Sequence, residues 1–327
     1  MLTDPLSDIL ALLNAHCLLS GRLIAGGDWS IKFPRPDAVK VSVVLKGKCW
    51  LLLENGSAPV QLEAGDVVML NGHHPTILAS DLALEPVDAV ATFRALGVDV
   101  ARLGTSEEFY YVGGHVALDP AGADMLRDAL PPLIHLRRGA PEAGVVAWLL
   151  DQLYDEMHAA RPGAALATAQ IAQLIFVQIL RSHIGSMDAG ATGWLRAMAD
   201  PRVASALKLM HAEPGRDWQL GELARAVGMS RTSFALRFRK VAGMAPLAYL
   251  AEWRMRLARR ALKDGEAVST VAHTLGYSSE SAFSHAFKRL TGSSPRAFRD
   301  SQRDLADART TDLSMPEPNA TMLRLAS

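Results

Sequence analysis

The 327-residue chain contains only two cysteines, Cys17 and Cys49. Two thiols cannot build the disulfide framework of a small secreted domain, which indicates a reducing compartment. The first residues, MLTDPLSDIL, lack the basic segment that opens a signal peptide. No uninterrupted apolar run reaches the about 18–20 residues that a membrane span requires. These absences argue against a secreted or membrane protein and predict a cytoplasmic one with no membrane partner.

Net charge is the second thing that the sequence lacks. Its 34 Lys and Arg residues balance its 34 Asp and Glu residues. This balance is an average, because residues 217–299 hold 14 basic and 6 acidic residues, whereas the remainder holds 20 basic and 28 acidic ones. A positive field confined to one module predicts a polyanionic partner for that module.

The length indicates two or three domains, since one typical core does not need so long a chain. Residues 1–118 have the pattern of β-structure. Apolar and polar residues alternate from Val39 to Lys46, and turn signals follow at Asn55-Gly56 and Gly65-Asp66. Short strands between such turns predict a small barrel or sandwich.

Residues 119–190 are predicted to be helical. The stretch VVAWLLDQLYDEMHAA places one apolar stripe along a helix, formed by Val146, Leu149, Leu150, Leu153 and Met157. After a break at 161–163, a second helix is apolar on more than one side, which indicates burial on more than one side. Two interpretations stay open, packing within the domain and a dimer seam between two protomers. We assign 119–190 as a dimerisation and linker segment.

Two stretches nearer the C-terminus repeat one pattern. They are GMSRTSFALRFRKVAGMAP, from Gly228, and GYSSESAFSHAFKRLTGSSP, from Gly276. An offset of 49 residues joins Phe234 to Phe283, Phe238 to Phe287, Gly243 to Gly292 and Pro246 to Pro295, and an offset of 48 joins the two leading glycines. Five matching positions in order indicate an internal duplication, with one residue more in the second turn.

Each copy predicts a helix, a short turn and a second helix. In the first copy, Gly228 suits the left-handed end of a helix and Ser230 can cap the next one. Gly276 takes the same place in the second copy, with Ser278 or Ser279 as the cap. At helical spacing, two sets of apolar residues are expected to face a core, namely Phe234, Phe238 and Val241 in the first copy and Phe283, Phe287 and Leu290 in the second.

The duplication has a physical rationale in the geometry of DNA. A major groove admits one helix, and groove segments on one face of B-DNA recur about every 34 Å. Between the copies lies PLAYLAEWRMRLARRALK, whose 18 residues form a helix roughly 27 Å long. Such a connecting helix can hold two recognition helices in successive grooves of one DNA face.

The C-terminal block resembles the DNA-binding domain of AraC/XylS-type bacterial transcription regulators. The resemblance rests on Trp218 to Ala224, on GMSRTSFALRFRKVAGMAPLAYL, on WRMRLARRAL, on VAHTLGYSSESAFSHAFKR and on GSSPRAFR. It implies a double helix-turn-helix domain over 191–299 that binds double-stranded promoter DNA and works with RNA polymerase, most often as an activator and as a homodimer. The polar remainder, 300–327, has no periodicity and is predicted to be disordered.

The resemblance also assigns DNA-contacting positions in each recognition helix. Ser230 and Ser279 cap the helices and bring their N-termini to phosphates. Arg239, Lys240 and Lys288 are expected to clamp phosphates, whereas Leu236 stands where many relatives have a basic residue. The positions expected to approach base edges are Arg231, Thr232, Ala235 and Leu236 in the first copy, and Glu280, Ser281, Ser284 and His285 in the second. A plainer interpretation as solvated helix faces stays open for Arg237 and Arg239, and for the arginines at 254, 256, 259 and 260.

The N-terminal region resembles a cupin-type sensor domain through GKCWLLLENG and LEAGDVVMLNGHHP. The whole chain is thus predicted to be an α+β multidomain protein, with a cupin-like β-barrel and helical segment before an all-α double helix-turn-helix. Cupin enzymes hold a metal with a His-x-His pair, a Glu four residues on and a distant His. When the sequence is aligned on Gly47, the His-x-His pair is replaced by Pro34 and Pro36, and the Glu by Lys40. Only the position of the distant His keeps a possible metal ligand, His73 or His74. We therefore expect no metal, no cofactor and no enzyme, and a pocket for a small-molecule effector or a stress signal.

Three alternatives remain from the sequence. One is a cupin metalloenzyme fused to a DNA-binding module. A second is a redox-sensing regulator that uses Cys17, beside His16, and Cys49. The third is a protein-interaction adaptor, which predicts acidic outer faces that Arg231 and Lys240 do not supply.

Overall fold

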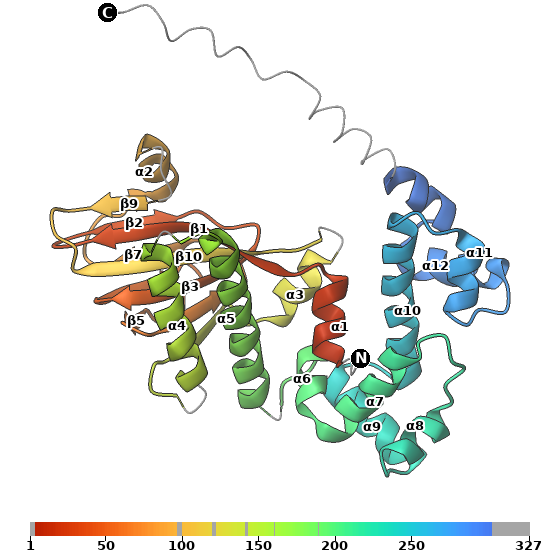
Figure 1. Cartoon of the computed structure of the whole chain (residues 1–327). Coiled ribbons are helices and arrows are strands. Elements are labelled where there is room, and N and C mark those ends of the chain that lie inside the picture. The colour runs from red at the N-terminus through yellow and green to blue at the C-terminus, as the bar shows by residue number, and fades with distance from the viewer. Residues whose placement is uncertain are drawn as a thin grey trace, which may run out of the picture. The chain divides into compact units, whose positions relative to one another are not determined.

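The structure, a computed structural model, describes residues 4–96, 100–119, 122–140, 143–159, 161–188 and 190–302 (Figure 1). The chain separates into two compact units, of which Ile9–Ala199 is one and Asp200 onward, together with the residues up to Asp8, is the other. The predicted disorder of the tail concerns mainly residues outside the described ranges. Residues 295–302 are helical and run past Arg299, where the sequence had suggested that regular structure stops.

The first unit is built on two sheets. One has the order β11-β6-β3-β10-β1-β9 and the other the order β5-β4-β7-β2-β8. The strands are β1 (His16–Ala25), β2 (Ser30–Phe33), β3 (Val39–Lys46), β4 (Lys48–Leu53), β5 (Val60–Glu63), β6 (Val67–Leu70), β7 (Thr76–Ala79), β8 (Val87–Asp88), β9 (Val100–Leu103), β10 (Phe109–Ala117) and β11 (Leu133–Leu136). The predicted β-structure of the N-terminal region is confirmed, and the turns at Gly56 and Gly65 have positive φ angles of 81° and 93°.

The interior between the two sheets is a single apolar cluster. Trp29, Leu51 and Leu78 are among its members and are at most 5% exposed. Val44 belongs to the same cluster, which places the face of β3 that carries Lys40 and Ser42 toward the barrel interior. The alternation along β3 therefore marks an inner face that is partly polar, and not a solvent face.

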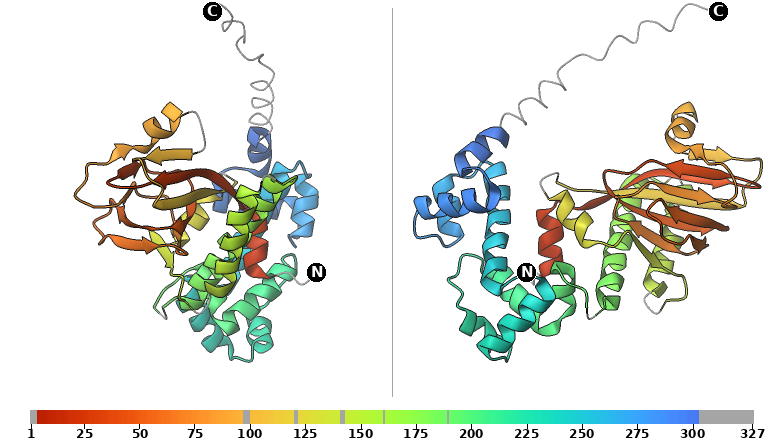
Figure 2. Two further views of the ribbon diagram at one scale, coloured as in Figure 1. Left: turned by 60° about the vertical axis from the view of Figure 1, so that its left-hand side comes forward. Right: turned by 180° about the vertical axis from the view of Figure 1, so that it is seen from behind.

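Six helices of the described chain lie between residues 5 and 199. They are α1 (Pro5–Leu12), α2 (Ala89–Leu96), α3 (Ala123–Ala129), α4 (Ala143–His158), α5 (Ala164–Ser186) and α6 (Trp194–Ala199). α5 packs against α4, β1 and β11, and α4 packs against β3 (Figure 1, Figure 2). Gln173 of α5 accepts the backbone N–H of Cys17 at 2.8 Å and donates to the carbonyl of Ala15 at 3.2 Å.

The helical segment is joined to the barrel more closely than its sequence suggests. The predicted helical texture misses β11, which pairs with β6 from Leu133↔Leu70 to Leu136↔Val67. Asp66 holds this strand in place, since its carboxylate lies 2.9 Å from His135 Nε2 and accepts the N–H of Arg138 at 3.0 Å. Residues 119–190 thus lie in the same compact unit as the strands.

One described helix, α5, is long and apolar enough to cross a membrane when only length and composition are considered. Glutamines interrupt this stretch, so no uninterrupted apolar run of this length was expected from the sequence. Ile175, Phe176, Ile179 and Leu180 are at most 1% exposed within the unit. These four side chains are buried against the rest of the unit, whereas Leu166 and Leu174 of the same helix are 68% and 50% exposed.

The second unit is all helical in its described part. Its elements are α7 (Pro201–Ala212), α8 (Leu220–Ala226), α9 (Arg231–Ala242), α10 (Pro246–Lys263), α11 (Val268–Thr274) and α12 (Glu280–Thr291). α7 packs against α8 and α9, while α10 contacts α9, α11 and α12. α10 thereby links two small helical cores, as the sequence predicted for the stretch between the two copies.

A buried histidine lies at the centre of the first of these cores. The ring of His211 stacks on Trp253 with centroids 3.9 Å apart, and its side chain is 1% exposed. Nε2 lies 2.8 Å from the Tyr249 hydroxyl and Nδ1 lies 3.1 Å from Asp8. Burial, with the nearby Arg256 as a second cause, lowers the pKa of His211 to about 4.

The depressed pKa predicts acid sensitivity of this unit. Between pH 6.5 and pH 4, His211 is protonated in the unfolded chain but remains neutral in the folded one. The free energy of unfolding therefore falls as pH falls through this window, by about 3 kcal/mol in all. Denaturant unfolding from pH 7 to pH 4 measures this loss. His211→Gln keeps hydrogen-bonding capacity but does not titrate, so the variant should have a shallower pH dependence. Equal slopes for the two proteins would contradict the assignment.

Candidate nucleic-acid interface

The two C-terminal copies have nearly the same architecture. α8 and α11 each have 7 residues and start 48 positions apart, at Leu220 and Val268. α9 and α12 each have 12 residues and start 49 positions apart, at Arg231 and Glu280. The extra residue lies in the second turn, as predicted, so the second helix of each copy is a matched element.

The turns and caps form as the sequence predicts. Gly228 and Gly276 have φ angles of 68° and 78°, a left-handed conformation that glycine adopts without the steric penalty of a Cβ atom. The hydroxyl of Ser230 accepts the N–H of Ser233 at 3.2 Å, and that of Ser279 accepts the N–H of Ala282 at 3.1 Å. Each second helix therefore begins at a serine cap in an exposed turn.

Pairs of phenylalanines fix which face of each second helix is buried. Phe234, Phe238, Phe283 and Phe287 are all 0% exposed. Val241 is also buried, but Leu290 is 44% exposed, so its predicted core position is wrong. Leu290 lies at the end of α12 beyond the second phenylalanine, where the small core has closed.

The opposite faces carry the residues that the resemblance assigned to DNA. In α9, Leu236 is 66% exposed, and in α12 the side chains alternate between exposed and half-buried. The exposed members are Ser230, Arg231, Thr232, Leu236, Arg239, Lys240, Ser279, Ser281, His285 and Lys288, and the half-buried ones are Ala235, Glu280 and Ser284. The structure therefore brings the predicted residues onto two outer helix faces.

The basic side chains on these two helix faces are not neutralised by acidic side chains of the same unit, so their charge can act on a partner. Within the described part of the chain, Arg231, Arg239, Lys240 and Lys288 have no acidic side chain within the 4.0 Å of an ion pair. Glu280 differs, since it pairs with Arg296 at 3.2 Å. The first copy thus presents more uncompensated positive charge than the second.

Other arginines have structural roles. Arg254 of α10 donates to the carbonyls of Pro214, at 2.6 Å, and Arg216, at 2.8 Å. Arg256 pairs with Glu252 at 3.1 Å and Arg260 with Asp264 at 2.8 Å, both within α10. Arg259 lies over the Phe298 ring at 5.4 Å. The interpretation of these side chains as a merely solvated face is therefore incomplete, since Arg254 in particular binds the loop before α8.

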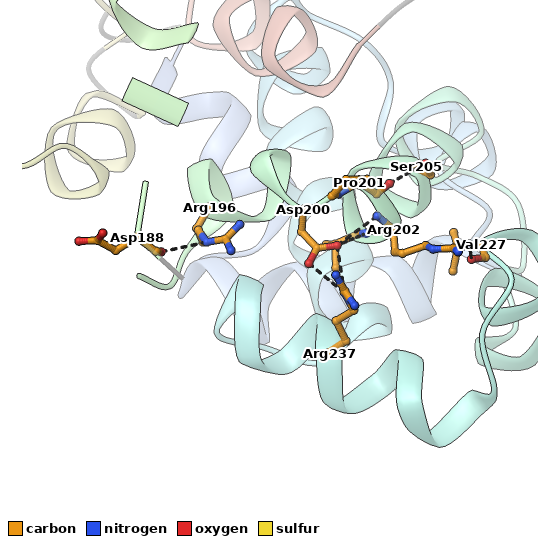
Figure 3. A network of polar contacts seen from close by, with 9 residues as sticks. Asp188, Arg196, Asp200, Pro201, Arg202, Ser205, Val227 and Arg237 are labelled. Carbon is orange, nitrogen blue, oxygen red and sulfur yellow. Dashed lines mark hydrogen bonds and ion pairs between the residues drawn. The ribbon is translucent and has the colours of Figure 1, made fainter. Parts of the chain in front are cut away.

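Asp200 connects the start of α7 to the first recognition helix (Figure 3). Its side chain caps α7 by accepting the N–H groups of Arg202 and Val203, both at 3.1 Å. It also accepts Arg237 Nε of α9 at 2.8 Å, and the Arg202 guanidinium donates to the carbonyl of Val227 at the end of α8. Burial acts to raise the pKa of Asp200, but the Val203 N–H, Arg237 and the Arg202 N–H together lower it.

The sequence analysis missed this role of Asp200, although a signal was present. Asp followed by Pro is a strong helix start, because Asp caps the helix and Pro suits its first position. The ion pair with Arg237 could not be inferred, since the two residues are 37 positions apart. Arg237 therefore ties α9 to the start of α7, although its side chain is 45% exposed.

The loop between α7 and α8 reaches the turn of the second copy. A Cβ atom on Gly215 would collide with the carbonyl of Thr274, and one on Gly276 would collide with the carbonyl of Gly215. Arg254 binds the same loop through two carbonyls. The two copies are thus held together by this backbone contact as well as by α10.

The barrel residues weighed for metal or redox chemistry are not assembled for either. No group of three or more His, Cys, Asp or Glu side chains that could hold a metal occurs in the described part of the chain. His73 lies 3.2 Å from Asp128, and His16 bonds to the carbonyl of Asn14 at 2.8 Å. Burial raises the pKa of Cys17 to about 11, and burial together with Asp66 raises that of Cys49 to about 12. Both thiols are thereby kept protonated at neutral pH, which opposes thiolate chemistry.

Comparison with known proteins agrees with these two architectures. Residues 4–185 match a family model described as a cupin, and residues 223–301 match one described as a helix-turn-helix domain. A putative AraC-like transcription regulator of Streptomyces antibioticus is 36% identical over 297 residues, which cover 90% of this chain and 98% of the relative. The HTH-type transcriptional regulator AlkR of Acinetobacter baylyi is 30% identical, with 84% of this chain and 91% of the relative covered.

A solved DNA-binding domain is also similar. It is that of AdpA, a global transcriptional factor in complex with a target DNA, and it is 33% identical over 33% of this chain and 97% of that one, with a TM-score of 0.32. The regulators of Streptomyces antibioticus and Acinetobacter baylyi, taken with the cupin and helix-turn-helix matches, define the class. The chain belongs to the AraC-like transcription regulators and carries a cupin domain at its N-terminal side.

The contact between Gly215 and Gly276 generates a stability prediction. Gly276→Ala adds a collision with the Gly215 carbonyl to the left-handed strain, so it should lower the free energy of unfolding by about 2–4 kcal/mol. Gly243 also has a positive φ angle, 80°, but open space where a Cβ would lie, so Gly243→Ala should cost only about 1 kcal/mol. Denaturant unfolding measures both variants, and similar losses would show that the contact between the copies is unimportant.

Proposed function

We propose that this chain binds promoter DNA through α9 and α12 and regulates transcription in response to a signal received by its cupin domain. The observation that carries this proposal is the matched pair of serine-capped helices with outward basic and polar side chains. Helices of this kind are suited to the major groove, and their N-termini are suited to phosphate. The double-stranded promoter is the polyanionic partner expected from the charge of residues 217–299.

We infer the role of each DNA-facing residue of α9 from its position along the helix. Arg231 and Thr232 are in the first turn, where a recognition helix enters the groove, and Ala235 and Leu236 follow one turn later. Arg231 can donate two hydrogen bonds to a guanine edge, and Leu236 can contact a thymine methyl. Arg239 and Lys240 lie toward the other end and are placed for phosphates. In α12 the shorter side chains of Ser281, Ser284 and His285 take the base-facing positions, with Lys288 as the phosphate contact.

A comparison of two arginines in α9 tests whether base contacts and phosphate contacts are separated in this way. Arg231→Ala should lower affinity by about 1–3 kcal/mol for the preferred site and relax discrimination at one base position. Arg239→Ala should weaken all sequences equally and reduce the magnitude of the salt slope by about 1. Binding to a randomised DNA pool, sequenced before and after selection at two salt concentrations, measures both effects.

The control for this experiment is Arg256→Ala, because Arg256 pairs with Glu252 on the connecting helix. It should leave the sequence preference unchanged. If Arg231→Ala instead weakens every sequence to the same degree, Arg231 is only a phosphate contact. If neither α9 variant changes binding, the proposed interface is wrong.

We further propose that the chain works as a homodimer through α4 and α5. Large apolar side chains are exposed on these helices, since Trp148 is 60% exposed, Val145 54%, Leu166 68% and Leu174 50%. A second copy of the chain is the partner that this apolar surface favours, because the two helices stand side by side and the same face is present on every copy. Two interpretations were left open for this segment. Packing within the domain accounts for its buried apolar stripe, and we propose that a dimer seam accounts for its exposed apolar side chains.

Replacement of the tryptophan tests the dimer. Trp148→Glu places a charge in the centre of the proposed seam and should convert a dimer into a monomer at micromolar concentration, as measured by analytical ultracentrifugation. The matched control is Leu82→Glu, since Leu82 is 39% exposed on a turn of the barrel. It should leave the sedimentation coefficient unchanged. A wild-type protein that sediments as a monomer, or a Trp148→Glu variant that remains a dimer, rejects this seam.

The remaining parts of the proposal come from the family. We propose activation as the main effect, RNA polymerase as a partner and the cytoplasm as the location. Run-off transcription with purified polymerase and a bound promoter tests the first two, because increased transcript supports activation and decreased transcript indicates repression. Neither the metalloenzyme nor the redox alternative is favoured by the side chains of the barrel.

A further inference from the structure

The barrel contains a cavity of about 560 Å³ between its two sheets. This size lies within the range of small-molecule sites in proteins, which is roughly 300–1,000 Å³. Its floor is formed by Leu23, Leu70 and Leu78, all at most 6% exposed. Phe33 of β2 and Phe93 of α2 form another wall, with ring centroids 6.4 Å apart. The cavity therefore has an apolar body that suits a hydrocarbon or aromatic group.

The space exists because small residues face one another across two strands. Gly21 of β1 pairs directly with Gly113 of β10, and both line the cavity. A Cβ atom built on Gly113 would lie 3.8 Å from Gly21 O, Ser42 Oγ and a ring carbon of Tyr111, which is ordinary van der Waals contact. The glycine pair therefore places no side chain in this part of the cavity.

Among the described lining residues, the charged side chain that faces the cavity is that of Lys40 on β3, and none of them is Asp or Glu. Arg22 of β1 also lines the cavity, but its side chain points to the other face of the sheet, because its neighbour Leu23 belongs to the interior cluster. Lys40 has no acidic partner within ion-pair distance in the described ranges of the chain. A half-buried positive charge without a partner is unfavourable, and burial lowers the pKa of Lys40. An anion in the cavity would supply the missing partner.

Hydroxyl groups line the cavity on the same side as Lys40 or elsewhere in its wall. Ser42 follows Lys40 on the same face of β3 and is 6% exposed, and its side chain hydrogen-bonds with Tyr111. Thr76 and Ser20 also line the cavity, and Ser20 Oγ lies 2.7 Å from His115 Nδ1. The polar groups are thus few and are combined with a large apolar wall, which is typical of a site that orients an amphipathic molecule.

The polar region coincides with the positions aligned to the metal ligands of cupin enzymes. Pro34, Pro36 and Lys40, which stand at those positions, all line the cavity. The chemistry at these positions is the reverse of a metal site, because prolines offer no ligand and lysine brings a positive charge. The position that would hold a cation in an enzyme carries a fixed cation here.

We propose that this cavity binds an amphipathic organic acid, whose carboxylate is held by Lys40 and whose hydrocarbon or aromatic body lies against the leucines and phenylalanines. This acid is the chemical class of the signal molecule, an identification that rests on the proposed function, whereas binding itself does not depend on it. Neutral alcohols of the same shape lack the charge and should bind more weakly.

Isothermal titration calorimetry on the full-length protein tests the proposal with two matched pairs of probes. Decanoate is compared with decan-1-ol, and 1-naphthylacetate with 2-(1-naphthyl)ethanol. At least one acid should bind, and about 10- to 100-fold more tightly than its alcohol, since hydrogen bonds to charged groups are stronger than neutral ones. Lys40→Met keeps the length of the side chain and removes its charge, so it should abolish most of this difference.

The control is Lys46→Met on the same strand, because Lys46 is exposed, donates to the carbonyl of Glu107 at 2.7 Å and does not line the cavity. It should bind the acid as the wild type does. Thermal unfolding confirms that both variants are folded before titration. Binding of neither acid, equal binding of acid and alcohol, or unchanged binding by Lys40→Met would each overturn the proposal.

A DNA-binding measurement separates this inference from the proposed function. If the acid binds in a Lys40-dependent way and also changes DNA affinity or transcription, both stand. If it binds but changes neither, the site is correct and the assignment of the acid as the signal fails. If the acid does not bind while the chain still recognises specific DNA, the inference fails and the regulatory function is unaffected.

Discussion

The orientation of the recognition helices depends on burial of two phenylalanines four residues apart in each of them. Phe234 with Phe238, and Phe283 with Phe287, are completely buried, and each ring of a pair contacts the other at 5.6–5.7 Å between centroids. Because each helix has one buried stripe, the opposite stripe is exposed by geometry alone. A change that rotated α9 by one residue would bury Arg231 or expose a phenylalanine, and both are costly. The hydrophobic effect thereby selects which side chains are presented to DNA.

Polar contacts then fix where each helix lies within its unit. Asp200 ties α7 to α9 through Arg237, and Arg254 ties α10 to the loop that meets the turn at Gly276. These contacts bind backbone carbonyls or a helix cap, so they restrict position more than a surface ion pair between two mobile side chains does. The spacing of the two outer faces is therefore set by packing and by the α7–α8 loop, in addition to the length of α10.

The sequence was sufficient for the parts of the fold that are local. Helix periodicity, glycines at left-handed turns and serine caps are all set by residues within a few positions of one another, and the two helix-turn-helix copies were predicted in detail.

Contacts across the chain were not predictable, and Arg237 and Arg254 were misjudged for that reason. The same limit applies to β3, because alternation reveals two faces but not which face is covered. Helices α4 and α5 cover one face, so Lys40 and Ser42 lie toward the barrel interior. Leu290 was misplaced because periodicity does not reveal where a small core ends.

The barrel interior illustrates why a hollow site persists in a domain without metal ligands. An ordinary core would gain stability from larger residues at Gly21 and Gly113 and from an apolar residue at Lys40, since filled volume and neutral side chains are favoured in protein interiors. The chain instead keeps the volume and the positive charge together at one place. A cavity alone could be an imperfection of packing, and a half-buried lysine alone could extend its ammonium to solvent. Their combination, with no acidic side chain among the described lining residues, favours a ligand that carries both an apolar body and a negative charge.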